Sequence, residues 1–95
     1  MADVTVKVFG VLRVDTHVAD EKVRADKLGD IFEVLNEKVD AIYAENVKAD
    51  PYLEHPAPLS FKDAIVYING ERCSKKNRKL NDGEEIWLLS PASGG

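Results

Sequence analysis

Few residues in this 95-residue chain could do chemistry on their own. His17 and His55 have no acid or nucleophile partner in a local motif, and we interpret both as ordinary surface or turn residues. Cys73 is the only cysteine; its basic neighbours favour a thiolate, so a nucleophilic or redox role stays open beside that of an incidental thiol. Two separated histidines and one thiol fall short of a zinc site, which needs closely spaced ligand pairs. The sequence therefore predicts no catalytic constellation, no metal site and no permanently bound cofactor.

The last six residues, SPASGG at 90–95, are the remaining candidate. Pro91 stiffens the exit from the apolar run before it, because its ring fixes one backbone angle. Gly94 and Gly95 lack a Cβ atom and therefore fit a channel too narrow for any other residue. When extended, the six residues reach about 20 Å. We interpret 90–95 as a flexible tail whose terminal carboxylate is the working group; an ordinary frayed terminus is the alternative.

Composition and charge exclude several classes of partner. The chain has 13 basic and 17 acidic side chains, a net charge of −4, which disfavours a nucleic-acid backbone as the main partner. The basic cluster at 72–79 also lacks interleaved aromatic residues that would stack on bases. No apolar run approaches the roughly 20 residues of a membrane span, and the first residues do not resemble a signal peptide. We expect a cytoplasmic protein with neither a nucleic-acid nor a membrane partner.

Hydrophobic periodicity predicts one α+β domain over residues 1–95. Alternating apolar residues predict strands at 4–10, 64–68 and 85–89, and a weaker, more polar strand at 21–25 after a connection at 12–19. Turns are expected at 69–70 and 81–83, with a charged connection at 75–79. The order is β-β-α-β-β, a mixed sheet with one long helix packed on one face.

The predicted helix begins near Asp26 or Asp30, either of which is a suitable N-cap, and runs to about Ala44. Apolar residues at helical spacing form one stripe: Leu28, Ile31, Phe32, Leu35, Val39 and Ile42. Acidic residues away from the stripe are expected to face solvent: Glu33, Glu37 and Asp40. The segment 47–60 has three prolines and no clear period, and we expect an ordered excursion packed by its own apolar residues.

The last strand carries apolar residues on both faces. Because side chains alternate along a strand, Trp87 and Leu89 point away from the face that holds Ile86 and Leu88. One helix covers only one face, so Trp87 and Leu89, with Tyr67 and Ile65, are expected on the uncovered side. An open apolar patch on a small protein favours a partner surface. The alternative is that the excursion at 47–60 folds over this patch.

Three segments together resemble a known family: KVFGVLRV at 7–14, YING at 67–70 and KLNDGEEIWLLSPASGG at 79–95. They are similar to the MoaD group, the small subunits of molybdopterin synthase, within the β-grasp, ubiquitin-like sulfur carriers that include ThiS. Val14 and Gly10 depart from the usual Glu and Ala of the family's first motif. The excursion is longer than in minimal carriers, which makes a ThiS assignment less suitable than MoaD.

The resemblance implies a mechanism and a set of partners. An adenylyltransferase of the MoeB type, related to the ubiquitin activators, would use ATP to adenylate the carboxylate of Gly95, next to Gly94. A sulfurtransferase would then supply sulfur, and the resulting thiocarboxylate would serve the MoaE-type large subunit in molybdenum or tungsten cofactor synthesis. The carrier would itself be a non-catalytic subunit. Leu89 falls at a family interface position, and we add Trp87, Tyr67 and Pro91 to that interface.

Other functions use the same tail. A ubiquitin-like modifier would form isopeptide bonds through Gly95, and related sulfur carriers serve tRNA thiolation or cysteine synthesis. A plain interaction domain would have an idle tail. The sequence does not separate these alternatives.

Overall fold

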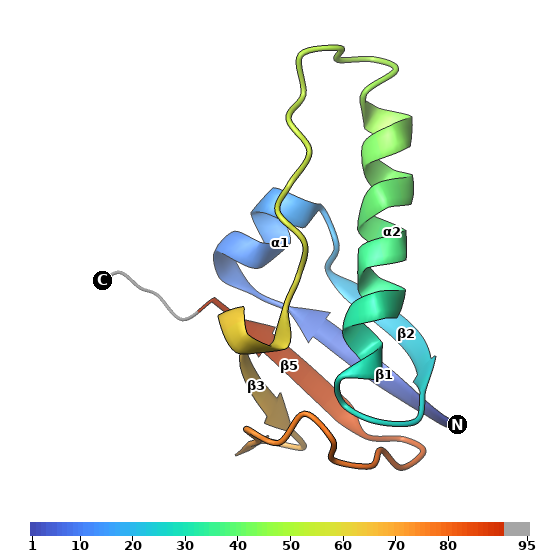
Figure 1. Ribbon diagram of the computed structural model, residues 1–95, viewed down its shortest axis with the longest axis vertical. Coiled ribbons are helices and arrows are strands. Elements are labelled where there is room, and N and C mark those ends of the chain that lie inside the picture. Colours follow the sequence, from blue (N-terminus) through green and yellow to red (C-terminus); the bar gives the residue numbers. More distant parts are fainter. Residues whose placement is uncertain (91–95) are drawn as a thin grey trace.

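A five-stranded mixed sheet forms the centre of the structure, a computed structural model that describes residues 1–90 except the side chains of Val11 and Asp15 (Figure 1). The strands are β1 (Ala2–Val8), β2 (Asp20–Ala25), β3 (Ile65–Ile68), β4 (Glu71–Arg72) and β5 (Glu85–Leu89), in the spatial order β2-β1-β5-β3-β4. β1 pairs antiparallel with β2 and parallel with β5, while β3 pairs antiparallel with both β5 and β4. This arrangement confirms the predicted α+β, β-grasp fold.

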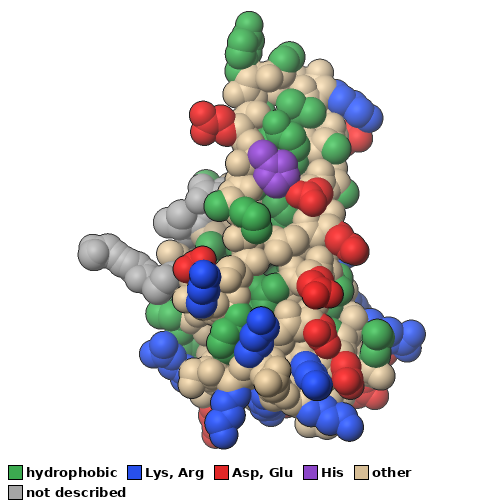
Figure 2. Space-filling model, viewed as in Figure 1, with side chains coloured by type: hydrophobic (Ala, Val, Ile, Leu, Met, Phe, Trp, Pro, Cys, Tyr) green, Lys and Arg blue, Asp and Glu red, His purple; other side chains and the backbone are tan. Residues whose placement is uncertain are grey.

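The helix α2 (Asp30–Asn46) packs on one face of the sheet, as its apolar stripe predicts. The core between them consists mainly of alternating strand residues, Leu28 in the turn before the helix and one side of the helix itself: Val4, Val6, Val8, Val23, Val66, Ile68, Ile86, Leu88, Leu28, Ile31, Phe32, Leu35 and Val39. Burying apolar area on this scale is the main force that holds the two layers together. The acidic residues Glu33, Glu37 and Asp40 are exposed, and Figure 2 shows acidic side chains gathered along the helix.

The start of α2 differs from the prediction. Neither Asp26 nor Asp30 is the N-cap: Gly29 holds that position and no side chain caps the helix. Asp30 is the first helical residue, and its carboxylate accepts a hydrogen bond from the N–H of Lys27 at 3.2 Å. The Leu28 and Gly29 N–H groups instead bond to the carbonyls of Arg78 and Lys76. A loop later in the chain therefore supplies the hydrogen-bond acceptors for the turn that leads into the helix.

β1 ends at Val8, and a short helix, α1 (Gly10–Thr16), replaces the end of the strand predicted at 4–10 and most of the connection predicted at 12–19. It is two turns long and ends at His17, which adopts a left-handed conformation with φ of 62°. The Thr16 hydroxyl donates to the Leu12 carbonyl at 2.6 Å and accepts from the Val18 N–H at 3.2 Å. Seven residues are too few to show a clear helical period, which explains why the sequence did not predict it.

The excursion at 47–60 returns alongside α2 and ends in the single turn η1 (Phe61–Asp63) (Figure 1). Leu59 is buried in the core, and the ring of Phe61 meets that of Phe32 edge-on at 6.0 Å. Asn36 on the helix donates to the Leu59 carbonyl at 2.9 Å and accepts from the Leu59 N–H at 2.7 Å. Leu59 and its two bonds to Asn36 thus hold the end of the excursion against the helix, whereas Tyr52, another of its apolar residues, is 93% exposed.

Candidate functional site

The strand β5 carries the chain from the middle of the sheet towards the predicted tail. It lies between β1 and β3, and Ser90, half-buried, follows it directly. Pro91, Gly94 and Gly95, the predicted working residues, lie outside the described residues. The structure therefore defines the surface at which the tail starts.

The sheet face away from α2 is apolar at its centre. Trp87 and Leu89 alternate with the buried Ile86 and Leu88 along β5, so they point away from the helix. Strand pairing places Tyr67 opposite Trp87 and Ile65 opposite Leu89, and all four side chains are half-buried. We call this surface the open face; it comprises Ile65, Tyr67, Trp87 and Leu89 together with Phe9.

Phe9 is a member of the open face that the sequence analysis missed. Its ring meets the indole of Trp87 edge-on, with centroids 5.8 Å apart and planes at 72°. Tyr67 lies on the other side of the indole, at 6.3 Å. Such aromatic contacts hold the rings in a defined arrangement. The sequence did contain a signal for Phe9: because Val4, Val6 and Val8 alternate on the covered face, the residue after Val8 falls on the opposite face.

An ion pair borders this face. Lys7 contacts Glu85 at 2.9 Å, and Lys7 is also the register partner of Trp87. The hydrogen bond from Lys7 lowers the pKa of Glu85, and the same bond raises the pKa of Lys7. The indole N–H of Trp87 also lowers the pKa of Glu85. This N–H itself has no hydrogen-bond partner among residues 1–90. Both charges are thus held at neutral pH, beside an apolar centre.

The excursion does not cover the open face, so that alternative is wrong. Its contacts are with the helices on the opposite side of the sheet: Tyr43 donates its hydroxyl to the Leu53 carbonyl at 3.0 Å, and His55 contacts Asp40 at 2.7 Å. A small cavity between them is lined by residues of α1, α2 and the excursion, among them Thr16, Val39 and Pro56. The open face stays uncovered by the described chain.

The two histidines and the cysteine are not brought into one site. His17 ends α1, and His55, exposed on the excursion, has an acidic partner after all, Asp40. Cys73 follows β4; its Sγ atom lies 3.8 Å from the Lys75 carbonyl. No hydrogen bond joins these three residues to one another within 1–90, and no group of His, Cys, Asp or Glu there could hold a metal ion.

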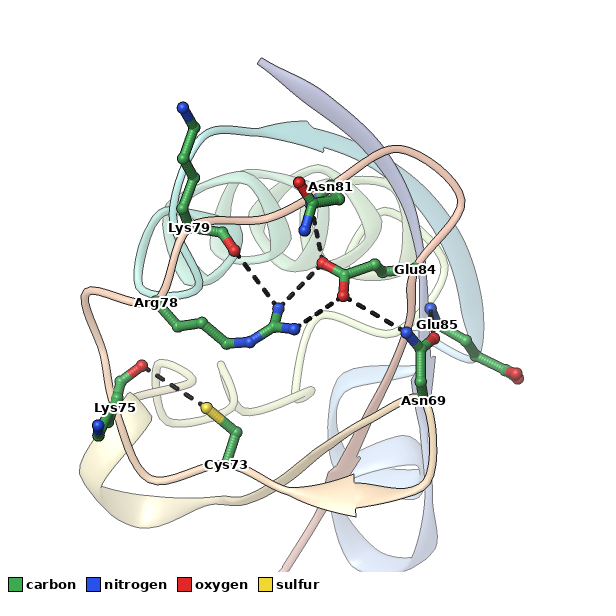
Figure 3. A network of polar contacts seen from close by, with 8 residues as sticks. All are labelled: Asn69, Cys73, Lys75, Arg78, Lys79, Asn81, Glu84 and Glu85. Carbon is green, nitrogen blue, oxygen red and sulfur yellow. Dashed lines mark hydrogen bonds and ion pairs between the residues drawn. The ribbon is translucent and has the colours of Figure 1, made fainter.

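A second feature missed by the sequence analysis is the ion pair between Arg78 and Glu84. The guanidinium donates two hydrogen bonds to the carboxylate, at 2.9 and 2.8 Å, and Glu84 also accepts the Asn81 N–H at 2.8 Å (Figure 3). The Arg78 bonds are the main cause of a lowered pKa at Glu84, and they raise the pKa of Arg78. Because Glu84 is buried and fully bonded, the loop at 73–84 keeps one shape beside β4.

In the described part of the chain, no helix has both the length and the apolar character that a membrane crossing requires.

Comparison with known proteins agrees with this geometry. The model of the ThiS family matches residues 6–95. No curated protein matched the chain. The solution structure of small archaeal modifier protein 1 from Methanosarcina acetivorans is 28% identical, with a TM-score of 0.69 over 100% of this chain and 98% of that one.

Two further solved structures are similar in fold. A putative molybdopterin converting factor subunit 1 from Pyrococcus furiosus is 20% identical with a TM-score of 0.64, over 97% of this chain and all of that one. A complex of subunits 1 and 2 of the molybdopterin-converting factor from Helicobacter pylori matches at 22% identity and a TM-score of 0.51, over 98% and 99%. At these identities the likeness is one of fold. Because the family model spans nearly the whole chain, the protein belongs to the ThiS family, the MoaD/ThiS-type group of ubiquitin-like sulfur carriers and modifiers.

Proposed function

We propose that this protein is a sulfur carrier for molybdopterin synthesis, activated at the carboxylate of Gly95. The open face is the observation that carries the proposal. It presents Trp87 and Leu89 on the strand that leads into the tail, so a protein docked there would receive the tail in a defined direction. The carrier would thus contribute by positioning its reactive end, and it would need no acid–base residues of its own.

The chemistry proceeds in three steps in partner active sites. The carboxylate attacks the α-phosphorus of ATP in a MoeB-type adenylyltransferase, and pyrophosphate leaves. The persulfide of a sulfurtransferase then attacks the acyl carbon and displaces AMP. A thiol cleaves the resulting acyl disulfide, which leaves a terminal thiocarboxylate and a disulfide on the sulfurtransferase. Activation is needed because a free carboxylate is a poor electrophile, whereas the acyl adenylate has a good leaving group. The thiocarboxylate is an anion at neutral pH and a ready nucleophile.

The recipient of the sulfur is proposed to be a MoaE-type large subunit. The solved Helicobacter pylori complex pairs subunits 1 and 2 of a molybdopterin-converting factor, and the first of these shares the fold of this chain. The open face is an apolar surface of the kind that such a subunit would cover. ATP belongs to the activating partner, and the carrier holds no cofactor of its own.

Mass spectrometry tests this function directly. Incubation with ATP and a cognate activating enzyme should yield the adenylate, and addition of the sulfurtransferase should exchange one oxygen for sulfur, about 16 Da. Deletion of Gly95 should abolish both products, and Trp87→Ala should slow adenylation while leaving the fold intact by circular dichroism. If the intact chain forms no adduct with any co-encoded activator, the proposal is overturned.

A second candidate is a ubiquitin-like modifier. The observation in its favour is the similarity to small archaeal modifier protein 1 at 28% identity over the whole chain. A modifier would be recovered from its host as a ladder of conjugates, joined from Gly95 to lysines of other proteins. Loss of this ladder on deletion of Gly95, together with unchanged pterin synthesis, would favour the modifier over the carrier.

A further inference from the structure

The open face ends at a positive charge. Trp87 is the register partner of Lys7 on one side and of Tyr67 on the other, and Tyr67 in turn pairs with Arg72 on β4. Directly paired residues project from the same face of a sheet. One row of side chains therefore crosses four strands, from Lys7 through two aromatic residues to Arg72. Lys7 is neutralised by Glu85, whereas Arg72 has no ion-pair partner within residues 1–90.

Arg72 also lines a groove of about 380 Å³ beyond β4. Lys75, Arg78 and Cys73 line it as well, with Glu71 as its acidic residue. Arg78 is committed to Glu84, but Lys75 has no ion pair in the described part of the chain, and neither have Lys76 and Lys79 on the same loop. Figure 2 shows basic side chains at the lower end of the molecule, where Figure 1 places this loop. Lys76 lines a separate hollow with Asp30 and Glu33, so we call only the groove surface with Arg72 and Lys75 the basic flank.

The basic flank has a fixed frame. The Cys73 N–H bonds to the Val66 carbonyl at 2.8 Å, and the Gly29 N–H bonds to the Lys76 carbonyl at 2.9 Å. The two hydrogen bonds from Arg78 to Glu84 link the two halves of the same loop (Figure 3). A groove whose backbone is already ordered loses little further conformational entropy when a ligand enters.

We propose that the basic flank receives an acidic segment of the protein that docks on the open face. The inference rests on the proposed function only in taking the open face as a docking surface. The Arg72 guanidinium can bind a carboxylate through two parallel hydrogen bonds, and Lys75 adds unpaired positive charge beside it. The partner should therefore carry Asp or Glu residues next to an apolar patch.

A short acidic protein segment fits this surface better than a nucleic acid does. None of the groove-lining residues is aromatic, so bases would find no stacking platform. The exposed Asp30, Glu33 and Glu37 on α2 and the net charge of −4 would repel a long polyanion that ran past the groove. A few carboxylates confined to the groove avoid that repulsion.

Charge reversal tests the proposal with the full chain and its activating enzyme. The double variant R72E/K75E should lower the catalytic efficiency of adenylation about tenfold to a hundredfold at low salt, with the loss shrinking at high salt, because steering between opposite charges is screened. The matched control R13E/K48E makes the same change in net charge, also at one arginine and one lysine, on exposed residues outside the sheet and the groove and should change the efficiency less than threefold. Equal losses in both variants, or no loss in R72E/K75E, would overturn the proposal.

A peptide titration separates this proposal from the proposed function. If the wild-type chain is not adenylated at all, the proposed function fails and the flank is judged by NMR alone. Hexaglutamate should shift the amide signals of residues 71–79 in a saturable manner, and hexaglutamine should not. Absence of these shifts, or stronger binding of a uridine oligonucleotide at the same amides, would show that the flank is not a site for an acidic protein segment.

Discussion

Two segments of the chain are each held in place by a charged pair, in very different surroundings. In the loop at 73–84 the Glu84 side chain is only 8% exposed and accepts both Arg78 bonds, while the loop backbone bonds to the turn before α2. On the excursion at 47–60 the His55 side chain is 44% exposed, and that of its partner Asp40 on α2 is 67% exposed. An exposed pair is screened by water and a buried, multiply bonded one is not.

The difference follows the positions of the two segments. The loop at 73–84 frames the basic flank beside β4, and its shape depends on charges that persist at neutral pH. The excursion lies on the helix side of the sheet, remote from the open face. Its contact depends on His55, whose pKa is raised above 6.5 by the hydrogen bonds to Pro56 and Asp40. The structure is therefore most firmly anchored where we propose that partners dock.

Glu84→Gln should produce the largest loss of stability. The amide cannot accept both Arg78 bonds and the Asn81 N–H as the carboxylate does, so the buried side chain at position 84 no longer serves all of its donors. We expect the free energy of unfolding to fall by about 1–3 kcal/mol, towards the lower end because Arg78 is one-third exposed. Urea denaturation followed by circular dichroism measures the change.

Glu85→Gln is the matched control. Glu85 is the next residue along the chain and also forms an ion pair, with Lys7, but both side chains are 39% exposed. Its replacement should change the urea midpoint much less than Glu84→Gln does. Equal effects of the two variants would show that burial does not distinguish the pairs, and the comparison would fail.

Acid should weaken the anchor of the 73–84 loop. The Arg78 hydrogen bonds lower the pKa of Glu84 below the ordinary carboxyl value of 4.5. Such a group contributes stability that is fully present above pH 4.5 and is lost as the pH falls through its lowered folded-state value. The difference in urea midpoint between wild type and Glu84→Gln should therefore be constant from pH 7 to about 5 and shrink below 4.5. A difference independent of pH down to 3 would contradict it.

The sequence predicts the elements that are long enough for their hydrophobic pattern to repeat several times. Alternation along β1 and β5 and the stripe of α2 gave the sheet, the helix and the uncovered face, because each pattern repeats several times and one face of each element is buried. The same reasoning failed for α1 and for β4, which has two residues. Short elements are set by tertiary pairing rather than by a pattern of their own.

The charged pairs could not be predicted in the same way. Arg78 and Glu84 are six residues apart in an irregular loop, and His55 meets Asp40 only because the excursion returns along the helix. No spacing rule predicts the path of a segment without a period. The proposed working end, Gly94 and Gly95, came from residue type and family resemblance, and it lies outside the described residues.

Asn36→Ala should loosen the excursion with a smaller effect on global stability. It removes the two mutual hydrogen bonds with Leu59 and leaves a partly buried N–H without its partner. We expect a loss of about 0.5–1.5 kcal/mol. Hydrogen exchange should accelerate in 47–60 while amides in β1 and β5 change little. Asn77→Ala, at an exposed residue, is the control. If hydrogen exchange in 47–60 accelerated similarly in this variant, the effect would not be specific to the Leu59 contact.

Raising the pH should release the His55 contact, the smallest of these effects. Nδ1 faces the Pro56 carbonyl and Nε2 faces the Asp40 carboxylate, each at 2.7 Å, so two acceptors are served only when both ring nitrogens carry protons. The ring also packs on Tyr43, with centroids 4.6 Å apart. These bonds, first that to Pro56 and then that to Asp40, raise the pKa of His55 above 6.5. Its stabilising contribution is then fully present below pH 6.5 and disappears as the pH rises through the raised value.

Proton NMR of the His55 ring, with hydrogen exchange in 47–60 corrected for intrinsic pH dependence, measures this release. Protection should decline across the titration of His55 in wild type and should stay level in His55→Gln, which cannot titrate. Asp40→Asn keeps an oxygen acceptor but removes the charge, so the titration midpoint should move down. Equal protection of 47–60 on both sides of the His55 midpoint would mean that the Asn36 and Tyr43 contacts hold the excursion by themselves. The His55–Asp40 and Arg78–Glu84 pairs would then differ in structural role as well as in burial.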